Sequence, residues 1–312
     1  MKAALIENYG DIEQLIVTEI QTPVIAADQV LIKIHAAGVN PVDAYIRSGM
    51  FKDTGTHTLP LTLGWDAAGT IEQIGDQVAT HNVGDQVFVM APIEKEGCYA
   101  QYLAVEANLV VAKPTNLSFA QSAAVPLAAL TAWQALFTQG KLQMGQRVLI
   151  HNTSGGVGSF AVQLAKAAGA HVIGTASAKN RAFVESLGVD EFIDYQKGKF
   201  EDQLDAVDLV LVAVGGTDIV ERSLSVIKPG GHLISLLDEL DAALAEPKKV
   251  TFHRLWVQSD AADLSQIKTL LEQEKVKVHL DSVLPLADAQ LAHQRIEGKH
   301  SVGKIVLEVI AD

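Results

Sequence analysis

Short apolar segments separated by turn residues fill the chain up to about Phe119. Turn signals such as Gly75-Asp76 and Gly84-Asp85 lie between them, and this spacing is typical of an antiparallel barrel or sandwich. One helix is expected to interrupt the strands at Pro41, because proline is well placed at a first helical position. The candidate strands are Ala3–Ile6, Leu15–Ile20, Gln29–His35, Ala67–Ile74, Gln86–Met90, Tyr99–Ala104 and Val110–Ala112.

The pattern of apolar and polar residues changes at Ser118. An alanine-rich helical stretch, broken near Pro126, is followed by strands and helices that alternate. Continuous apolar strands indicate a parallel sheet covered on both faces, so the sequence predicts a doubly wound α/β architecture here. Residues 279–312 add one helix and one strand, which can return to the first domain. The expected strands of the sheet are Arg147–Ile150, His171–Thr175, Glu191–Asp194, Leu209–Val214 and His232–Leu237.

Composition narrows the class of protein. A chain of 312 residues is long enough for two domains. Its formal net charge of −13 favours solubility and argues against a broad nucleic-acid-binding surface. No apolar run reaches about 18 residues, so we expect no membrane span. The single cysteine, Cys98, excludes an intrachain disulfide and a multi-cysteine zinc site; with no signal-peptide pattern at the start, we expect a cytoplasmic protein.

A glycine-rich turn, Ser154–Gly158, carries the first candidate chemistry. The apolar strand before it and the amphipathic helix after it form the geometry that offers backbone N–H groups to a phosphate. Gly155 is expected to allow the tight turn, and Gly156 with Val157 to bring the backbone to a pyrophosphate. Gly158 is expected to let helix and strand pack closely. The alternative is a glycine loop that only joins two elements of a structural domain.

The end of the next strand selects between two nicotinamide cofactors. An NAD site usually has an acidic residue there, about twenty residues after the glycines, for the ribose 2′-hydroxyl. Thr175–Asn180 contains no acid. Ser177 can donate to a 2′-phosphate and Lys179 can neutralise it, so the sequence favours NADPH over NADH. The alternatives are helix capping by Ser177 or Asn180 and a solvated surface lysine at position 179.

Several motifs occur in a fixed order: AAGVNPVDAYIRSG (residues 36–49), GWDAAG (64–69), GDQV (84–87), AAVPLAALTAW (123–133), SGGVGSFAVQLAK (154–166), LGVDEFIDY (187–195) and GKIV (303–306). With them the chain resembles the zinc-free quinone oxidoreductases of the medium-chain dehydrogenase/reductase superfamily. The resemblance implies an α/β fold with a GroES-like β-barrel domain over residues 1–119 and 279–312, and an inserted doubly wound (Rossmann) domain that binds NADPH over residues 120–278. It also implies an active site in the cleft between domains and a homodimer, with residues 230–237 (GGHLISLL) as an edge strand for pairing; the alternative is that this strand is simply covered.

Two positions separate the chain from the zinc-dependent members of that superfamily. Those members carry a cysteine where Asn40 stands and a histidine where Trp65 stands. Because zinc needs three or four N, S or O ligands, the resemblance implies hydride transfer without a metal. The acceptor must then already be electrophilic, as a quinone or a conjugated enone is, while NADPH supplies the hydride and the protein supplies orientation and polarity.

The resemblance places Asn40 and Tyr45 at the nicotinamide end of the site. Tyr45 is the candidate to donate a hydrogen bond to the acceptor or to orient it, and Asn40 is the candidate to contact the ribose or the nicotinamide amide. The alternative for Tyr45 is an amphipathic tyrosine packed on the barrel. Asp43 and Arg47 are expected to form a local pair with a structural role.

Three further positions are assigned by the same resemblance. Thr131 matches a residue near the nicotinamide phosphate, and Tyr195 matches one near the adenosine 2′-phosphate. Gly215 follows a strand whose carboxyl end should meet the cofactor. The alternatives are a Thr131 hydroxyl bonded to its own helix backbone and a strand-end aromatic at Tyr195. Three functions stay open: a quinone reductase, a reductase of conjugated enones or enals, and a non-catalytic NADPH-binding sensor.

Overall fold

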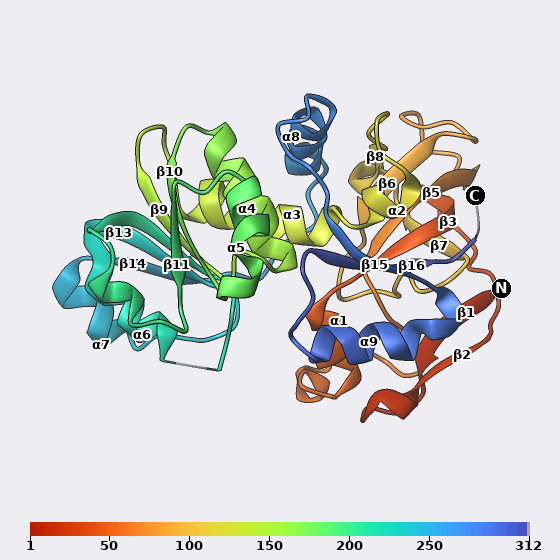
Figure 1. Ribbon diagram of the computed structural model, residues 1–312. Coiled ribbons are helices and arrows are strands. Elements are labelled where there is room, and N and C mark those ends of the chain that lie inside the picture. The colour runs from red at the N-terminus through yellow and green to blue at the C-terminus, as the bar shows by residue number, and fades with distance from the viewer. Residues whose placement is uncertain (217, 311–312) are drawn as a thin grey trace. The chain divides into compact units, whose positions relative to one another are not determined.

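The chain folds into two compact units. The computed structural model describes residues 1–216 and 218–310 (Figure 1). The first unit contains Met1–Ala128, Gln258–Glu272 and the described residues from Val278 onward. The second contains Ala129–Val257 and Gln273–Lys277. The first unit is therefore built from separate stretches of the chain.

Two sheets form the body of the first unit. The smaller has the order β2-β1-β4, and the larger has the order β15-β16-β3-β5-β6-β8, with β7 also paired to β3. Apart from the parallel pair β15 and β16, the pairings are antiparallel, as the short strands and their turns predict. The strands are β1 (Lys2–Ile6), β2 (Leu15–Glu19), β3 (Gln29–Val39), β4 (Leu61–Thr62), β5 (Asp66–Ile74), β6 (Gln86–Met90), β7 (Tyr102–Glu106), β8 (Val111–Ala112), β15 (Leu280–Pro285) and β16 (Lys304–Glu308).

The end of the chain completes the larger sheet. β16 pairs antiparallel with β3, so that Ile305 lies opposite Val39. Helix α8 also belongs to the first unit, whereas the sequence assigns it to the nucleotide-binding domain; it packs beside β8. The helices of this unit are α1 (Pro41–Arg47), α2 (Phe119–Ala123), α8 (Ala261–Glu272) and α9 (Ala289–Glu297), with short 3-10 turns η1 (Ile12–Gln14), η2 (Lys52–Thr54), η3 (Ala107–Leu109) and η9 (Leu286–Asp288).

A parallel sheet forms the centre of the second unit. Its order is β11-β10-β9-β12-β13-β14, and the pairings are parallel, which confirms the predicted doubly wound architecture. The strand order reverses between β9 and β12, and ligands of such sheets bind at the carboxyl ends of the strands at this point. The strands are β9 (Arg147–His151), β10 (His171–Ala176), β11 (Glu191–Asp194), β12 (Val207–Val212), β13 (Ile227–Ser235) and β14 (Thr251–Arg254).

The expected edge strand lies inside this sheet. Residues 230–237 overlap β13, which pairs with β12 on one side and with β14 on the other. The prediction of a β13 edge is therefore wrong, because the short strand β14 covers it; β14 and β11 stand at the two ends of the sheet order.

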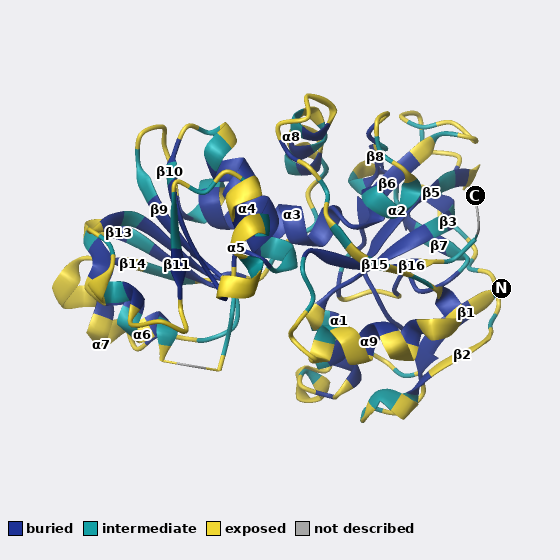
Figure 2. Cartoon of the chain, in the orientation of Figure 1, coloured by how far each residue is buried: buried dark blue, intermediate teal, exposed yellow. Residues whose placement is uncertain are grey.

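Apolar strands and helices bury the core of the second unit. The inner strands β9, β12 and β13 are buried along most of their length (Figure 2), and Leu149, Val210 and Leu233 belong to one core cluster. Helix α4 presents its apolar face to β9 and β10. The remaining helical segments are α3 (Pro126–Trp133), η4 (Gln134–Gln139), α4 (Gly156–Ala167), η5 (Ala178–Asn180), α5 (Arg181–Ser186), η6 (Phe200–Asp202), α6 (Ile219–Ser223), η7 (Leu224–Val226), α7 (Ala242–Ala245) and η8 (Glu246–Lys248).

Candidate active site

The glycine turn lies where the sequence predicts it, between the carboxyl end of β9 and the start of α4. The Gly155 N–H donates to the Asn152 carbonyl at 3.1 Å and closes the turn. Helix α4 begins at Gly156, with Gly155 as its N-cap residue. The first N–H groups of a helix have no partner within the helix and carry a partial positive charge, so this end of α4 suits a phosphate.

The structure shows what a side chain at position 155 or 158 of the glycine turn would contact. Gly155 has φ −78°, which any residue adopts, and the left-handed residue of the turn is Asn152 with φ 60°. A Cβ at Gly155 would lie 2.8 Å from Asn152 Nδ2, so glycine there leaves room for the asparagine side chain. At Gly158 a Cβ would lie 2.1 Å from the Asn152 carbonyl oxygen, which agrees with the close packing expected there.

Three consecutive residues fasten this turn to three neighbouring segments. The Asn152 side chain donates to the carbonyl of Ala213, just after β12, at 3.1 Å. The Thr153 hydroxyl donates to the Thr175 carbonyl of β10 at 3.0 Å. The Ser154 hydroxyl oxygen accepts from Asn180 Nδ2 at 2.9 Å. The glycine turn is thereby held at the carboxyl edge of the sheet from both sides and from the η5 loop.

The predicted 2′-phosphate residues lie at adjacent strand ends. Ser177 follows β10 and is 6% exposed, and Lys179 is exposed in η5. Tyr195 follows β11 and is 57% exposed. Because Ala176 of β10 lies opposite Asp194 of β11, Ser177 and Tyr195 are neighbours across the two strand ends. The side chains of Ser177 and Asn180 make no cap hydrogen bond, so the alternative of helix capping is wrong for both.

Gly215 lies at the corresponding end of β12. A Cβ there would be 2.8 Å from the Leu237 side chain, so the segments that follow β12 and β13 approach closely. The next residue, Gly216, has φ 78° and donates its N–H to the Asp238 carboxylate at 3.0 Å. The predicted residues of this unit other than Thr131 thus all lie at the carboxyl edge of one sheet: Gly156 and Val157 at the start of α4, and Ser154, Gly155, Ser177, Lys179, Tyr195 and Gly215 in the connecting segments.

His151, beneath the turn, is a buried residue that the sequence did not single out. Its Nδ1 lies 3.1 Å from the Thr175 hydroxyl and its Nε2 lies 3.3 Å from the Ser223 hydroxyl. Burial, together with the nearby Arg222 charge, lowers the His151 pKa to about 3. The imidazole is therefore neutral near pH 7 and joins β9, β10 and α6 without a charge.

Asn40, in the first unit, is held by a buried charged pair. It precedes α1 and is 2% exposed. Its Nδ2 donates to Asp66 Oδ2 at 2.9 Å, and its Oδ1 accepts from the Lys304 ammonium. Lys304 also donates to the Val39 carbonyl at 3.1 Å and lies 3.6 Å from Asp66. The amide orientation of Asn40 is thus fixed from both ends.

A second carboxyl group completes this group of residues. Asp43 Oδ2 accepts from the Asn40 N–H at 2.8 Å and from the Tyr99 hydroxyl at 2.6 Å, while Oδ1 has no hydrogen-bond partner among the described residues. Burial raises the Asp43 pKa to about 7, against the opposing effect of the Tyr99 hydrogen bond. Burial also raises the pKa of Asp66 and lowers that of Lys304. We call Asn40, Asp43, Asp66, Tyr99 and Lys304 the α1 cluster.

Arg47 has partners other than the one expected. It forms an ion pair with Glu297 at 2.5 Å and donates to the Gly10 carbonyl at 2.9 Å and to His293 Nδ1 at 3.2 Å. The predicted Asp43–Arg47 pair is therefore wrong: the side chain of Arg47 extends toward α9, and that of Asp43 toward Tyr99. Both are structural contacts that anchor α1.

The remaining predicted residues lie on two helices. Tyr45 is half-buried on α1, and Thr131 is buried on α3. The structure thus places Asn40 and Tyr45 together on one short element of the first unit. It places Thr131 in the second unit, outside the loops that surround the glycine turn.

The donor set around Asn40 does not fit a zinc ion. Both ends of the Asn40 amide are engaged, and the Trp65 indole N–H, which has no lone pair to offer, donates to the Lys95 carbonyl at 3.1 Å. Burial and the nearby Asp66 charge raise the pKa of the Cys98 thiol, which disfavours the thiolate that zinc requires. Among residues 1–216 and 218–310, no group of three or more His, Cys, Asp or Glu side chains could hold a metal.

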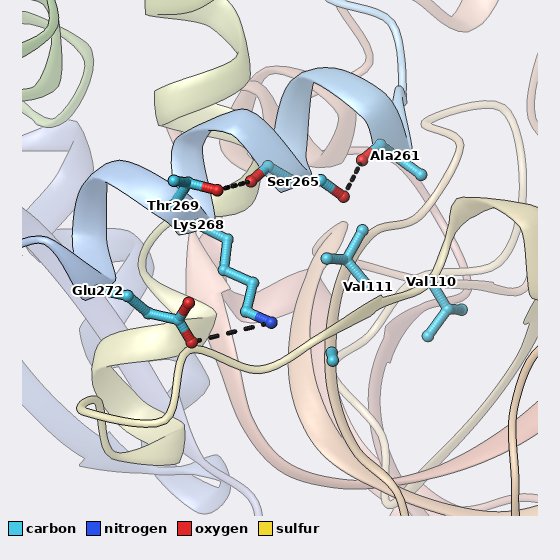
Figure 3. A pocket seen from close by; sticks show the side chains of 8 residues that line it. Val110, Val111, Ala261, Ser265, Lys268, Thr269 and Glu272 are labelled. Carbon is cyan, nitrogen blue, oxygen red and sulfur yellow. Dashed lines mark hydrogen bonds and ion pairs between the residues drawn. The ribbon is translucent and has the colours of Figure 1, made fainter.

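A shallow pocket of about 380 Å³ lies between α8 and β8 (Figure 3). The Ser265 and Thr269 hydroxyls donate to carbonyls of their own helix, and Lys268 lies 3.8 Å from Glu272. The polar side chains of α8 that line the pocket therefore already have partners, and none of the predicted site residues is among the residues that line it. In the described part of the chain, no helix is long and apolar enough to cross a membrane.

Comparison with known proteins agrees with this architecture. Residues 26–115 match the alcohol dehydrogenase GroES-like domain, and residues 187–307 match the zinc-binding dehydrogenase family. An NADPH-dependent alkenal/one oxidoreductase from Arabidopsis thaliana is 36% identical over 98% of this chain and 79% of its own. A quinone-oxidoreductase homolog from Spinacia oleracea is 34% identical over 96% and 95% of the two chains.

A solved structure extends the likeness to three dimensions. The quinone oxidoreductase from Coxiella burnetii has a TM-score of 0.93 and 34% identity, and 99% of each chain is covered. The fold and site thus define an oxidoreductase with a GroES-like part and a Rossmann-like parallel sheet. The chain belongs to the medium-chain dehydrogenase/reductase superfamily, within its zinc-free quinone oxidoreductase group.

Proposed function

We propose that this protein transfers hydride from NADPH to a quinone without zinc. The observation that supports NADPH most strongly is the end of β10. A buried serine, an exposed lysine and the exposed Tyr195 ring lie there at adjacent strand ends, and the β10–η5 segment Thr175–Asn180 has no carboxylate. A 2′-phosphate needs donors and positive charge, whereas a ribose 2′-hydroxyl is usually held by an acid.

The residues of the second unit fit such a cofactor. The N–H groups at the start of α4, including those of Gly156 and Val157, suit the pyrophosphate. Ser177 and Lys179 would hold the 2′-phosphate, with Tyr195 beside them, and Gly215 would let the chain after β12 approach the cofactor. When bound, NADPH supplies the hydride.

The residues of α1 supply orientation at the reacting end. The Asn40 amide has a second N–H beyond the one bonded to Asp66, and it is the candidate contact to the ribose or nicotinamide amide. Tyr45 is the candidate donor to the acceptor oxygen, where negative charge develops as hydride arrives. We assign Thr131 to the nicotinamide phosphate. The residues near Asn40 do not fit zinc, and no step requires one.

One of the similar proteins favours a second class of hydride acceptor. The Arabidopsis thaliana relative is named for alkenals and alkenones, so a conjugated enone is the alternative acceptor. Steady-state rates with a simple quinone and with a linear enone, each with NADPH, decide between them. A higher kcat/KM for the quinone supports the main proposal, and a higher value for the enone supports the alternative. NADPH binding without turnover of either acceptor supports the sensor and contradicts both.

The cytoplasmic location and the homodimer expected from the sequence stay predictions. For a dimer, the exposed side of β14 (Thr251–Arg254) is the available edge next to β13, since an uncovered edge can pair with a second copy. Light scattering on the purified protein measures the mass directly. A mass near 33.3 kDa, the mass of one chain, would contradict the dimer.

A further inference from the structure

Asn180 occupies a helix-capping position without capping the helix. It is the N-cap residue of α5, yet its side chain makes no cap hydrogen bond. Its Nδ2 instead donates to the Ser154 hydroxyl oxygen, 26 residues earlier, at 2.9 Å. An asparagine at this position normally accepts from a nearby backbone N–H. The Asn180 side chain therefore joins two separate loops and does not cap its own helix.

The two loops are the ones that contact different phosphates in the proposed cofactor complex. Ser154 belongs to the turn assigned to the pyrophosphate. The Asn180 backbone N–H donates to the Ser177 carbonyl at 2.9 Å, so Asn180 also closes the short η5 turn that carries Ser177 and Lys179. Its backbone fixes the shape of the 2′-phosphate loop, and its side chain fixes the position of that loop against the glycine turn.

The same bond also orients the Ser154 hydroxyl. Because the Ser154 oxygen accepts from Asn180, its own O–H is left to donate elsewhere. Ser154 is buried beside the start of α4, where an anion is favoured. Lys179 is exposed and has a long side chain that must become ordered when it binds a 2′-phosphate. A loop that is already fixed lowers the entropy cost of this ordering.

We propose that Asn180 is a positioning residue for cofactor specificity: through Ser154 it holds the Ser177–Lys179 loop at the distance from the phosphate turn that suits a 2′-phosphorylated dinucleotide. This inference rests on the proposed NADPH dependence. It adds a residue that contacts neither phosphate. Its signature is a change in the preference for NADPH over NADH, because only NADPH carries the 2′-phosphate that Ser177 and Lys179 would hold.

The test measures dissociation constants for NADPH and NADH by fluorescence titration of the full-length protein. Asn180→Ala should raise the NADPH constant about fivefold, the effect of one lost hydrogen bond, and change the NADH constant less than about twofold. In a Ser154→Ala background, Asn180→Ala should cause little further loss of preference, since the bond is already absent. Gln203→Ala is the matched control: it removes a comparable bond to the Lys199 carbonyl of 3.0 Å and should leave the preference unchanged.

Lys179→Ala separates the inference from the proposed function. If Lys179→Ala abolishes the preference and Asn180→Ala does not alter it, the positioning role is wrong and the NADPH site stands. Equal weakening of both cofactors by Asn180→Ala, with a lowered melting temperature, shows a purely structural role and also overturns the inference. A wild-type protein without preference for NADPH, or a Lys179→Ala variant with unchanged preference, overturns both.

Discussion

The glycine turn of the second unit and the α1 cluster of the first unit both hold polar side chains in place, but they do so by different physical means. Asn152, Thr153 and Ser154 use neutral hydrogen bonds between loops at the edge of a sheet. The α1 cluster buries two carboxyl groups and an ammonium group around one amide. Neutral hydrogen bonds each contribute modestly to stability, whereas a buried charge depends strongly on its partner.

Because of this difference, substitutions in one region should mainly affect anion binding, and substitutions in the other should mainly affect stability. A change at the glycine turn should alter the site for an anion while leaving most of the second unit's core in place, since that core is apolar. A change in the α1 cluster leaves a buried charge without compensation and should threaten the first unit itself. Variants of each kind therefore test whether the two regions differ as the structure indicates.

The largest expected effect is that of Lys304→Met. It removes the ammonium group that contacts Asn40 and Asp66, and leaves the Asp66 carboxyl buried with fewer partners. We expect the free energy of unfolding to fall by about 3–5 kcal/mol, measured by urea denaturation. Lys268→Met on α8 is the control, because the ammonium of Lys268 lies 3.8 Å from Glu272 in a partly exposed pair, and its loss should change stability by less than about 1 kcal/mol. Equal losses in the two variants would contradict the buried role of Lys304.

Gly158→Ala tests the packing of the glycine turn. The new Cβ would lie 2.1 Å from the Asn152 carbonyl oxygen, and the backbone of a tethered turn cannot move away without breaking its bonds. We expect a loss of about 1–3 kcal/mol and a raised dissociation constant for NADPH. In Gly298→Ala the nearest atom is 3.3 Å away, so stability and binding should change little. An unaltered NADPH constant in Gly158→Ala would show that the turn does not bind the cofactor.

The most gradual effect, spread over several pH units, concerns the pH dependence of stability. An Asp whose pKa is raised in the folded state contributes stability that is present at low pH and is lost as pH rises through the folded pKa. For Asp43 this window runs from about 4, the ordinary value, to about 7. The stability of wild type relative to Asp43→Asn should fall by up to about 1.4 kcal/mol per pH unit in this window. A constant difference between pH 4 and 7 would show that Asp43 has an ordinary pKa when folded.

Local signals explain why the second unit was predictable. The glycine turn, the apolar strands and the absence of an acid after β10 are patterns within short stretches, and the structure places each on the expected element. The room that Gly155 leaves for the Asn152 side chain could not be foreseen, because no local pattern reveals the direction of that side chain. The edge strand was misplaced because β14 is too short and polar to stand out.

The α1 cluster could not be found in this way. Its members come from positions 40, 43, 66, 99 and 304. The pairing of β3, β5 and β16 in one sheet brings Asn40, Asp66 and Lys304 together, and Tyr99 joins them from the segment before β7. The sequence signal that existed was an acid and a lysine inside otherwise apolar motifs, GWDAAG and GKIV. A charge in such a motif needs a buried partner, and searching for that partner would have linked Asp66 to Lys304. The Asp43–Arg47 pair failed because spacing along a helix ignores the tertiary contacts of Tyr99 and Glu297.

The most direct test of the central claim is quinone reduction by protein stripped of metal with a strong chelator. We expect kcat/KM with NADPH to equal that of the untreated protein and to exceed the value with NADH at least about tenfold, as one lost charge-assisted contact to the 2′-phosphate implies. Activity that disappears on chelation and returns with zinc, or equal rates with NADPH and NADH, would contradict the account.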